Sequence, residues 1–238
     1  AVQACTLQGA GRFVIEESLP QPGAYQLVSP DIATCADCRR ELFDPQDRRY
    51  GYPFINCTNC GPRFTIIRDI PYDRPNTTMA RFEMCSECAS EYQNPSDRRF
   101  HAQPVACATC GPQVWLERGS DGDLIGRRDE ALRQAREMIR DGAILAIKGL
   151  GGFHLACDAT NHSAVLELRG RKLRVDKPFA LMLADPEAIA AHCLVSPVER
   201  ELIQQRERSV VIVRRRPDSP ISDQVAPGQN TLGVMLPY

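Results

Sequence analysis

Eight cysteines between positions 35 and 110 constrain this chain more than any other feature of its sequence. They form four Cys-x-x-Cys pairs: Cys35/Cys38, Cys57/Cys60, Cys85/Cys88 and Cys107/Cys110. The last two pairs repeat the first two at a distance of 50 residues, and neighbouring segments repeat with them, since residues 45–50 return as 95–100 and residues 57–62 as 107–112. The chain therefore contains two copies of one small module.

The cysteine pairs predict zinc. A Cys-x-x-Cys turn holds two thiolates on one side of a tight loop, and two such turns complete the tetrahedron of sulfurs that Zn²⁺ accepts. We therefore expect two zinc ions per chain, with Gly61 and Gly111 allowing the chain to turn sharply after a knuckle. The alternatives are a disulfide framework, which rarely repeats Cys-x-x-Cys four times with matched gaps, and a redox pair of the thioredoxin type. Zinc-binding thiolates also predict a reducing, cytoplasmic location.

The spacing leaves two ways of combining the pairs. Each repeat can bind its own zinc, or the outer pairs (Cys35/Cys38 with Cys107/Cys110) and the inner pairs can combine. We expect one zinc per repeat, because a loop of 18 residues closes at a lower entropic cost than one of 68.

Charge and hydropathy exclude some classes of partner. The chain has 29 basic and 30 acidic residues, and it contains no apolar run of the roughly 20 residues that a transmembrane helix needs. Between residues 28 and 117, 10 arginines face 12 acidic residues. Two four-thiolate zinc centres would lower the net charge of that segment to about −6. A protein that binds the phosphate backbone should be basic, so we expect neither nucleic acid nor membrane as a partner.

The pattern along the chain divides it into three segments. Residues 1–28 contain one expected strand, at 11–16, and look like the tail of a preceding domain. Residues 29–118 hold the two zinc modules, whose order we expect to come from metal because apolar residues are few. A turn at 119–123 marks a boundary, and residues 124–238 alternate between helix and strand signals, which is typical of an α/β domain.

Local signals place the elements of this third segment. We expect helices at 129–140 (capped by Asp129 and stopped by Gly142), at 163–169, from Asp185 to His192, and from a capping box at Ser196 to about residue 207. Expected strands are 143–147, 179–183, 210–213 and 232–236. The first of these is apolar throughout, which is typical of strands buried on both faces.

Two stretches carry candidate binding chemistry. A glycine-rich loop from Gly149 to His154 follows Lys148, but it matches neither phosphate fingerprint, so a tight exit from the strand is the alternative. Five cations lie among the nine residues 169–177. Such a cluster favours a polyanion such as a triphosphate, and a solvated basic turn is the alternative. The only lysines of the chain, Lys148, Lys172 and Lys177, all lie in these two stretches, although chance clustering of three residues is an alternative.

These residues together resemble the HypF family of hydrogenase maturation carbamoyltransferases. The C-x2-C-x18-C-x2-C-x24-C-x2-C-x18-C-x2-C pattern is similar to the family's double zinc finger. Residues 148–159, 171–180 and 232–238 look like its YrdC-like domain, and Lys172-x-Arg174 resembles the Lys-x-Arg that grips nucleotide phosphates there. The resemblance implies a YrdC-like α/β fold preceded by a small two-zinc module.

The resemblance covers nearly all of this chain but only part of the family. Residues 1–18 look like the end of an acylphosphatase domain, and the Ser-x-Asn element of the YrdC nucleotide site would lie beyond Tyr238. Met235 stands where generic YrdC proteins tend to carry Arg, in agreement with the hydrogenase branch. We therefore expect this chain to be incomplete as an enzyme, binding nucleotide weakly and catalysing nothing alone.

The resemblance also implies a reaction. In the family, carbamate released from carbamoyl phosphate joins ATP, with Mg²⁺, to give carbamoyl-adenylate, and the carbamoyl group passes to the terminal cysteine of a HypE-type partner to become the cyanide ligand of the nickel-iron centre. Candidate nucleotide and substrate residues are Lys148, His154, Lys172, Arg174 and Lys177. The cations would act electrostatically. His154 could donate a proton or simply fix the loop, and no catalytic residue is assigned.

Two functions of other classes stay open. A zinc ribbon that binds nucleic acid is opposed by the negative charge of the cysteine segment. A protein-interaction module of the DnaJ type fits the knuckles but leaves the α/β segment without a purpose. Cys5, Cys157 and Cys193 lie outside the repeats, and we expect them to be ordinary thiols.

Overall fold

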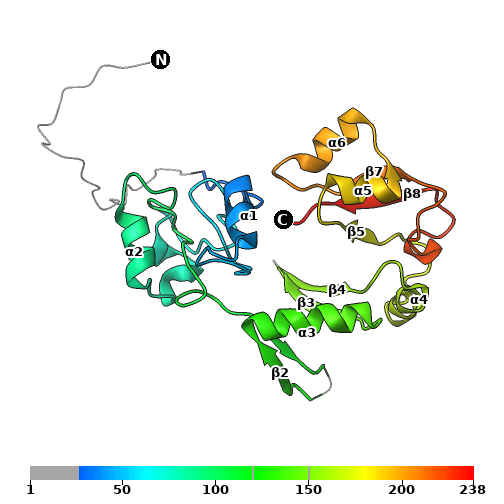
Figure 1. Ribbon diagram of the computed structural model, residues 1–238, viewed down its shortest axis with the longest axis horizontal. Coiled ribbons are helices and arrows are strands. Elements are labelled where there is room, and N and C mark those ends of the chain that lie inside the picture. Colours follow the sequence, from blue (N-terminus) through cyan, green and yellow to red (C-terminus); the bar gives the residue numbers. More distant parts are fainter. Residues whose placement is uncertain (1–26, 120, 150) are drawn as a thin grey trace, which may run out of the picture.

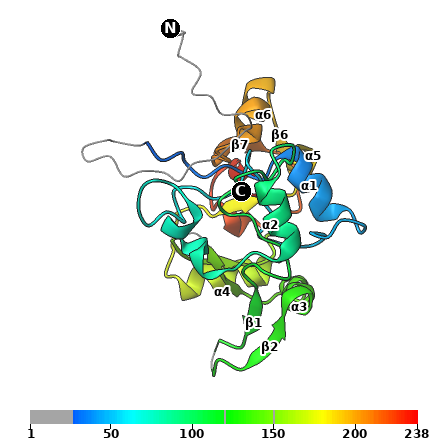
Figure 2. The same ribbon diagram turned by 90° about the vertical axis from the view of Figure 1, so that its left-hand side faces the viewer.

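The computed structural model describes residues 27–119, 121–149 and 151–238. The strand expected at 11–16 and Cys5 lie outside the described residues. Figure 1 shows a metal module (residues 27–114) at one end of the molecule and an α/β part (residues 115–238) at the other. Figure 2 views the molecule from the metal-module end, with α1 and α2 toward the reader.

Each repeat of the metal module contributes one short helix, α1 (Ala36–Phe43) or α2 (Ser86–Gln93). Both helices begin directly after the first cysteine of a repeat, which serves as the N-cap. Two 3-10 turns, η1 (Arg74–Asn76) and η2 (Thr78–Arg81), lie between the repeats. A small core surrounds the first cysteine cluster and includes Tyr52, Ile55, Met79 and Ala106. Apolar packing therefore supplements the metal in ordering this module, although the sequence predicts order from metal alone.

The metal module is followed by a hairpin and a helix. β1 (Trp115–Glu117) and β2 (Leu124–Arg127) pair antiparallel and contact α3 (Arg128–Arg140). The turn expected at 119–123 includes residue 120, which lies outside the described residues; its other residues follow β1 and precede β2 in the chain. The N-cap of α3 is Arg127, with no side-chain hydrogen bond, so the prediction that Asp129 caps this helix is wrong. The stop at Gly142 agrees with the structure, since this glycine takes a φ of +91°.

The next segment differs most from expectation. The predicted buried strand and glycine-rich loop form an antiparallel hairpin of β3 (Leu145–Gly149) and β4 (Gly152–Ala156). Only Leu145 on these strands is buried, while Ile147 is 47% and Phe153 67% exposed. The prediction of burial on both faces is wrong, because an apolar run does not reveal how many layers cover it. His154 lies in a strand rather than in a loop.

A mixed four-stranded sheet forms the rest of the α/β part. Its order is β5-β8-β7-β6, with bounds Ala180–Met182 (β5), Cys193–Leu194 (β6), Val211–Arg215 (β7) and Thr231–Met235 (β8). β5 pairs parallel with β8, and the other pairs are antiparallel. Val213, Leu232 and Val234 of the sheet pack with Ile189 and Ile203 in the main core.

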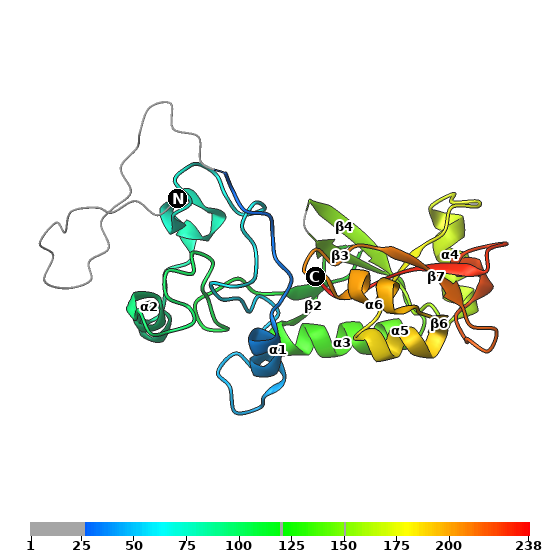
Figure 3. The same cartoon turned by 90° about the horizontal axis from the view of Figure 1, so that it is seen from above.

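Helices cover this sheet where the local signals predict them. α5 (Pro186–His192) and α6 (Pro197–Gln204) lie on one face of the sheet (Figure 3). Asp185 caps α5, and the capping box between Ser196 and Glu199 is formed, so both predictions are confirmed. α4 (His162–Arg171) starts one residue before its expected Ser163, with Asn161 as its N-cap, and η3 (Asp223–Val225) follows β7.

The two parts of the molecule meet at the start of the metal module. The backbone N–H of Ala33 donates to the carbonyl of Arg206, just after α6, at 3.3 Å. Among the described residues, no helix combines the length and the apolar character that crossing a bilayer requires.

Candidate functional site

The sulfurs of each cysteine repeat converge on one point. Within each repeat, the four sulfurs lie within 4.8 Å of one another. The first set is Cys35, Cys38, Cys57 and Cys60, and the second is Cys85, Cys88, Cys107 and Cys110. Within these sets the Cys57–Cys60 and Cys107–Cys110 sulfurs lie 3.8 Å apart. A sulfur tetrahedron with the usual Zn–S bond of about 2.3 Å has edges of about 3.8 Å. The residues therefore fit zinc, and the structure has one four-cysteine site per repeat, as the loop lengths predict.

Backbone groups complete these knuckles. The N–H of Asn59 donates to the sulfur of Cys57 at 3.3 Å, and Thr109 does the same for Cys107 at 3.4 Å. The two glycines after the knuckles serve different purposes. Gly61 takes a φ of +100°, and a Cβ there would also lie 2.6 Å from Cβ of Asn56. Gly111, in contrast, needs no positive φ, and a Cβ there would lie 2.1 Å from the hydroxyl oxygen of Tyr52. The sequence predicts a sharp turn at both glycines, but at Gly111 close packing is what excludes a side chain.

The thiols of the first site compete for protons. Hydrogen bonds from Cys38 and Cys60 lower the pKa of the Cys57 thiol. Hydrogen bonds with Cys57 and Cys60 raise the pKa of Cys38 in turn. A zinc ion would resolve this competition by holding all four sulfurs as thiolates, and its binding would release their protons.

Each cysteine site receives arginines from the other repeat. Arg98 Nη1 donates to Cys38 Sγ at 3.0 Å, and its counterpart Arg48 donates through Nη2 to Cys88 Sγ at 2.9 Å. Arg49 Nη2 also approaches Cys88 Sγ, at 3.5 Å. A cation that donates to a thiolate forms a charge-assisted hydrogen bond and offsets part of the negative charge of the site.

Glutamates on the two helices hold these arginines. Arg48 and Arg49 pair with Glu91, Arg98 and Arg99 pair with Glu41, and Arg48 also pairs with Glu87 on α2. Burial opposes ionisation of both carboxyls, but the arginines outweigh it and keep the pKa of Glu41 and of Glu91 below the ordinary value. The same pairing therefore occurs twice, in opposite directions between the repeats.

The basic loop (residues 172–177) is built on a buried arginine. Arg169 donates through Nη1 to the carbonyls of Arg174 at 2.7 Å and Val175 at 3.0 Å. Its Nε donates to the carbonyl of Gln224 at 3.0 Å, and the guanidinium lies 4.7 Å from the centroid of the Phe179 ring. This one cation of the cluster is therefore committed to shaping the loop.

The three candidates on the basic loop differ in their freedom. Arg174 donates to the carbonyls of Lys177 at 2.9 Å and Pro178 at 2.7 Å, and it lies over the Phe179 ring at 5.1 Å. Lys172, the C-cap of α4, and Lys177 are exposed. Across the described residues, neither ammonium group has a hydrogen bond or an ion pair, so both can meet a ligand.

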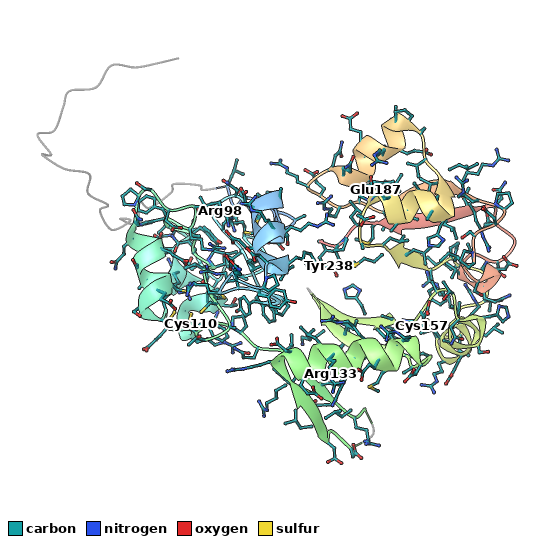
Figure 4. The ribbon with its side chains drawn as sticks, in the orientation of Figure 1. Arg98, Cys110, Arg133, Cys157, Glu187 and Tyr238 are labelled. Carbon is teal, nitrogen blue, oxygen red and sulfur yellow. The ribbon has the colours of Figure 1, made fainter. Side chains whose placement is uncertain are left out.

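The other two candidates lie on the β3–β4 hairpin. Lys148 Nζ lies 5.0 Å from the centroid of the Phe153 ring, and His154 Nε2 lies 3.3 Å from the hydroxyl oxygen of Tyr238 (labelled in Figure 4). A Cβ on Gly149 would lie 2.4 Å from the His154 ring. Within the described part of the chain, no hydrogen bond or ion pair joins Lys148 or His154 to the basic loop, so the five candidates occupy two separate elements.

Comparison with known proteins gives two different family models for two parts of the chain. A family model described as HypF finger matches residues 34–67 and 84–117, and a Sua5/YciO/YrdC model described as telomere recombination matches residues 137–238. The carbamoyltransferase HypF of Synechocystis sp. is 52% identical over 240 residues, which cover all of this chain. The chain belongs to the HypF family. The HypF of Rhodobacter capsulatus is also 52% identical, over 219 residues and 91% of this chain.

Solved HypF structures share this fold. A full-length HypF described as phosphate- and nucleotide-bound has a TM-score of 0.83 and 49% identity over 91% of this chain and 28% of its own length. HypF from T. kodakarensis has a TM-score of 0.84 and 51% identity over 93% of this chain and 29% of its own. The chain spans 31% of the Synechocystis HypF and 28% of that from R. capsulatus.

Sequence reasoning assigned no role to the arginines of the HypF fingers. Their signal is the repeated Asp-Arg-Arg at 47–49 and 97–99, which the structure shows to be the contact between the repeats. It also missed Arg169 as the support of the basic loop and Tyr238 as the partner of His154. A buried arginine cannot be told from an exposed one by its place in a basic cluster.

Proposed function

We propose that this chain is the zinc-finger and nucleotide-handling section of a HypF carbamoyltransferase that serves nickel-iron hydrogenase maturation. The observation that carries the proposal is 52% identity with a carbamoyltransferase HypF along the whole chain. Likeness to a HypF solved in a phosphate- and nucleotide-bound form supports a nucleotide site in this section. The family resemblance supplies the substrates, carbamoyl phosphate and ATP, and a HypE-type partner whose C-terminal cysteine accepts the carbamoyl group as precursor of the cyanide ligand.

The basic loop is the phosphate-binding element in this proposal. A carbamate oxygen attacks the α-phosphate of ATP, the bond from that phosphate to the β-phosphate breaks, and pyrophosphate leaves as carbamoyl-adenylate forms. Negative charge builds on the phosphoryl oxygens, so fixed cations lower the barrier electrostatically, together with Mg²⁺. Lys172 and Lys177 supply ammonium groups that have no protein partner among the described residues, whereas Arg174 divides its guanidinium between carbonyls and ligand.

The β3–β4 hairpin supports the basic loop in this proposal. Lys148 adds a further cation to the substrate, held over Phe153 by a cation–π contact. His154 bonds Tyr238, so we assign it to positioning the hairpin rather than to proton transfer. The finger pair acts as a rigid scaffold with two zinc ions. All cysteines of the described residues are free thiols, which suits a reducing, cytoplasmic location.

The test uses the full-length protein to which this section belongs. Lys172→Ala and Lys177→Ala should each lower carbamate-dependent ATP/pyrophosphate exchange by at least about 100-fold, the order expected when a preorganised charge is removed from a transition state. Hydrolysis of carbamoyl phosphate should be unchanged in both. Arg171→Ala is the matched control, because Arg171 is the last residue of α4, directly before Lys172, and pairs with Glu167 of the same helix. No loss in Lys172→Ala and Lys177→Ala would make the cluster a solvated turn, and an equal loss in Arg171→Ala would show that the effect is not specific to the two lysines.

A further inference from the structure

The two zinc sites are linked by arginines that cross between the repeats. Arg98 of the second repeat reaches the sulfurs of the first site, Cys38 at 3.0 Å and Cys35 at 3.9 Å. Arg48 of the first repeat reaches Cys88 of the second site at 2.9 Å. Both arginines are largely shielded from solvent, with side-chain exposures of 22% and 27%. Part of the negative charge of each site is therefore offset by an arginine that belongs to the other repeat.

The position of these arginines in the chain connects them to their own metal site. Residues 44–56 run from the end of α1 to the second knuckle of the first repeat, so they form the loop that zinc closes when it joins Cys38 to Cys57. Arg48 lies on this loop. In the second repeat, residues 94–106 form the corresponding loop, which zinc closes when it joins Cys88 to Cys107, and this loop carries Arg98. Zinc in one repeat thus orders the loop that presents an arginine to the other.

Further contacts hold each loop against the opposite knuckle. The N–H of Thr58, in the first site, donates to the carbonyl of Arg98 at 3.2 Å, and its hydroxyl donates to the carbonyl of Phe100 at 2.9 Å. Arg49 Nε donates to the carbonyl of Ala106, beside the second site, at 2.9 Å. These hydrogen bonds hold each arginine-bearing loop against the cysteine site of the other repeat. When zinc orders one loop, the arginine on that loop is therefore positioned at the other site.

We propose that Arg48 and Arg98 are positioning residues that couple the two sites, so that zinc bound by one repeat raises the zinc affinity of the other. A four-thiolate zinc site carries a net charge of about −2, and a guanidinium hydrogen-bonded to its sulfurs stabilises the metal-loaded form more than the empty one. Coupling between two sites is reciprocal, so each repeat strengthens the other by the same factor. Removing such an outer partner of a metal ligand typically lowers metal affinity about 10- to 100-fold.

The first test is zinc titration of the metal-free chain, followed by native mass spectrometry. Wild type should pass from no zinc to two, with a share of one-zinc species well below that of two independent, equal sites. Arg48→Gln and Arg98→Gln should each raise the one-zinc share and lower the overall zinc affinity about 10-fold or more. Arg40→Gln is the control, because Arg40 lies on α1, has a side chain 69% exposed and, among the described residues, pairs with Asp37 alone.

A second measurement separates coupling from a general loss of folding. With ¹¹³Cd in place of zinc, Arg48→Gln should shift the cadmium resonance of the second-repeat site, and Arg98→Gln should shift that of the first-repeat site. Arg48→Lys, which keeps the positive charge, should recover part of the zinc affinity that Arg48→Gln loses. In a chain carrying Cys85→Ser and Cys107→Ser, which leaves Cys88 in place, the zinc affinity of the first site should fall about 10-fold. A statistical one-zinc share in wild type, or an unchanged first site in the double serine variant, would overturn the proposal.

Discussion

The guanidinium of Arg169 lies 4.7 Å from the centroid of the Phe179 ring and donates to carbonyls of the loop that carries Lys172 and Lys177. Arg169 is buried, and its side chain donates to backbone carbonyls in the second half of that loop, from Arg174 to Lys177, and at η3. The cluster therefore contains two kinds of cation. Arg169 shapes the loop, and Lys172 and Lys177 remain exposed at its surface for a ligand.

This arrangement predicts that Arg169→Met unfolds the basic loop and destabilises the α/β part by about 3 kcal/mol, because several carbonyls that it satisfies would be left without partners. Urea unfolding gives the stability, and hydrogen exchange over residues 172–178 reports the loop. Arg171→Met, at a residue whose side chain is 68% exposed, should change stability by less than about 0.5 kcal/mol. Equal effects of the two variants would contradict a supporting role for Arg169.

The two four-cysteine sites predict two zinc ions per chain and a selective response to chelation. Elemental analysis should give two, and a strong chelator should expose the amides of residues 30–114 to exchange. The sheet of β5 to β8 should keep its protection, because its core of Ile189, Ile203 and Val234 contains no metal ligand. A stoichiometry of one, or loss of protection in both parts together, would contradict this prediction.

Some features of this fold were predictable because their cause is local. The Cys-x-x-Cys spacing places two sulfurs in one turn whatever surrounds it, and Asp185 and Ser196 cap their helices through residues only three positions away. The short loop between knuckles likewise favoured the pairing within each repeat. In all these cases, the interacting groups are close in the sequence.

Features that depend on distant residues were not predictable. Arg48 meets Cys88, and Arg98 meets Cys38, across separations of 40 and 60 residues, so the repeated arginines carry no local sign of their partner. The apolar run at 143–147 predicts a strand but not which layers cover it, and Ile147 is exposed in the structure. Neither feature could be inferred without the arrangement of the elements in space.

The ion pairs of Glu41 predict a pH dependence of finger stability. Arg98 and Arg99 hold the pKa of Glu41 below its ordinary value of 4.5 despite the burial of the carboxyl. A carboxyl with a lowered pKa contributes stability above the unfolded-state pKa and loses it as pH falls through the folded-state pKa. Glu41→Gln should therefore destabilise the zinc-loaded chain by about 2 kcal/mol at pH 7. The difference from wild type should shrink only below pH 4.5, the ordinary pKa of the carboxyl.

Urea unfolding in excess zinc at a series of pH values measures this difference. Because Arg98 also donates to Cys38, the difference reports the carboxyl of Glu41 together with the zinc site that its arginine supports. Asp37→Asn is the control, because its pair with Arg40 is exposed and such pairs contribute about 0–1 kcal/mol. A Glu41→Gln difference that stays constant to pH 3.5, or that grows on acidification, would show that the carboxyl is not held ionised by the arginines.

The last prediction concerns the packing of the second knuckle. A methyl group on Gly111 would lie 2.1 Å from the hydroxyl oxygen of Tyr52 and 2.5 Å from Cβ of Ala106. Tyr52 is buried, and its hydroxyl donates to the carbonyl of Pro112 at 3.2 Å, so the ring has little room to withdraw. Gly111→Ala should therefore cost about 1–3 kcal/mol, the usual range for overpacking, whereas Gly119→Ala, with open space around its position, should be nearly neutral. Tyr52→Phe together with Gly111→Ala should recover part of the loss, because the oxygen that clashes most closely is gone. Thermal unfolding of the four zinc-loaded proteins tests this, and a double variant no more stable than Gly111→Ala alone would place the strain in the backbone of the knuckle instead.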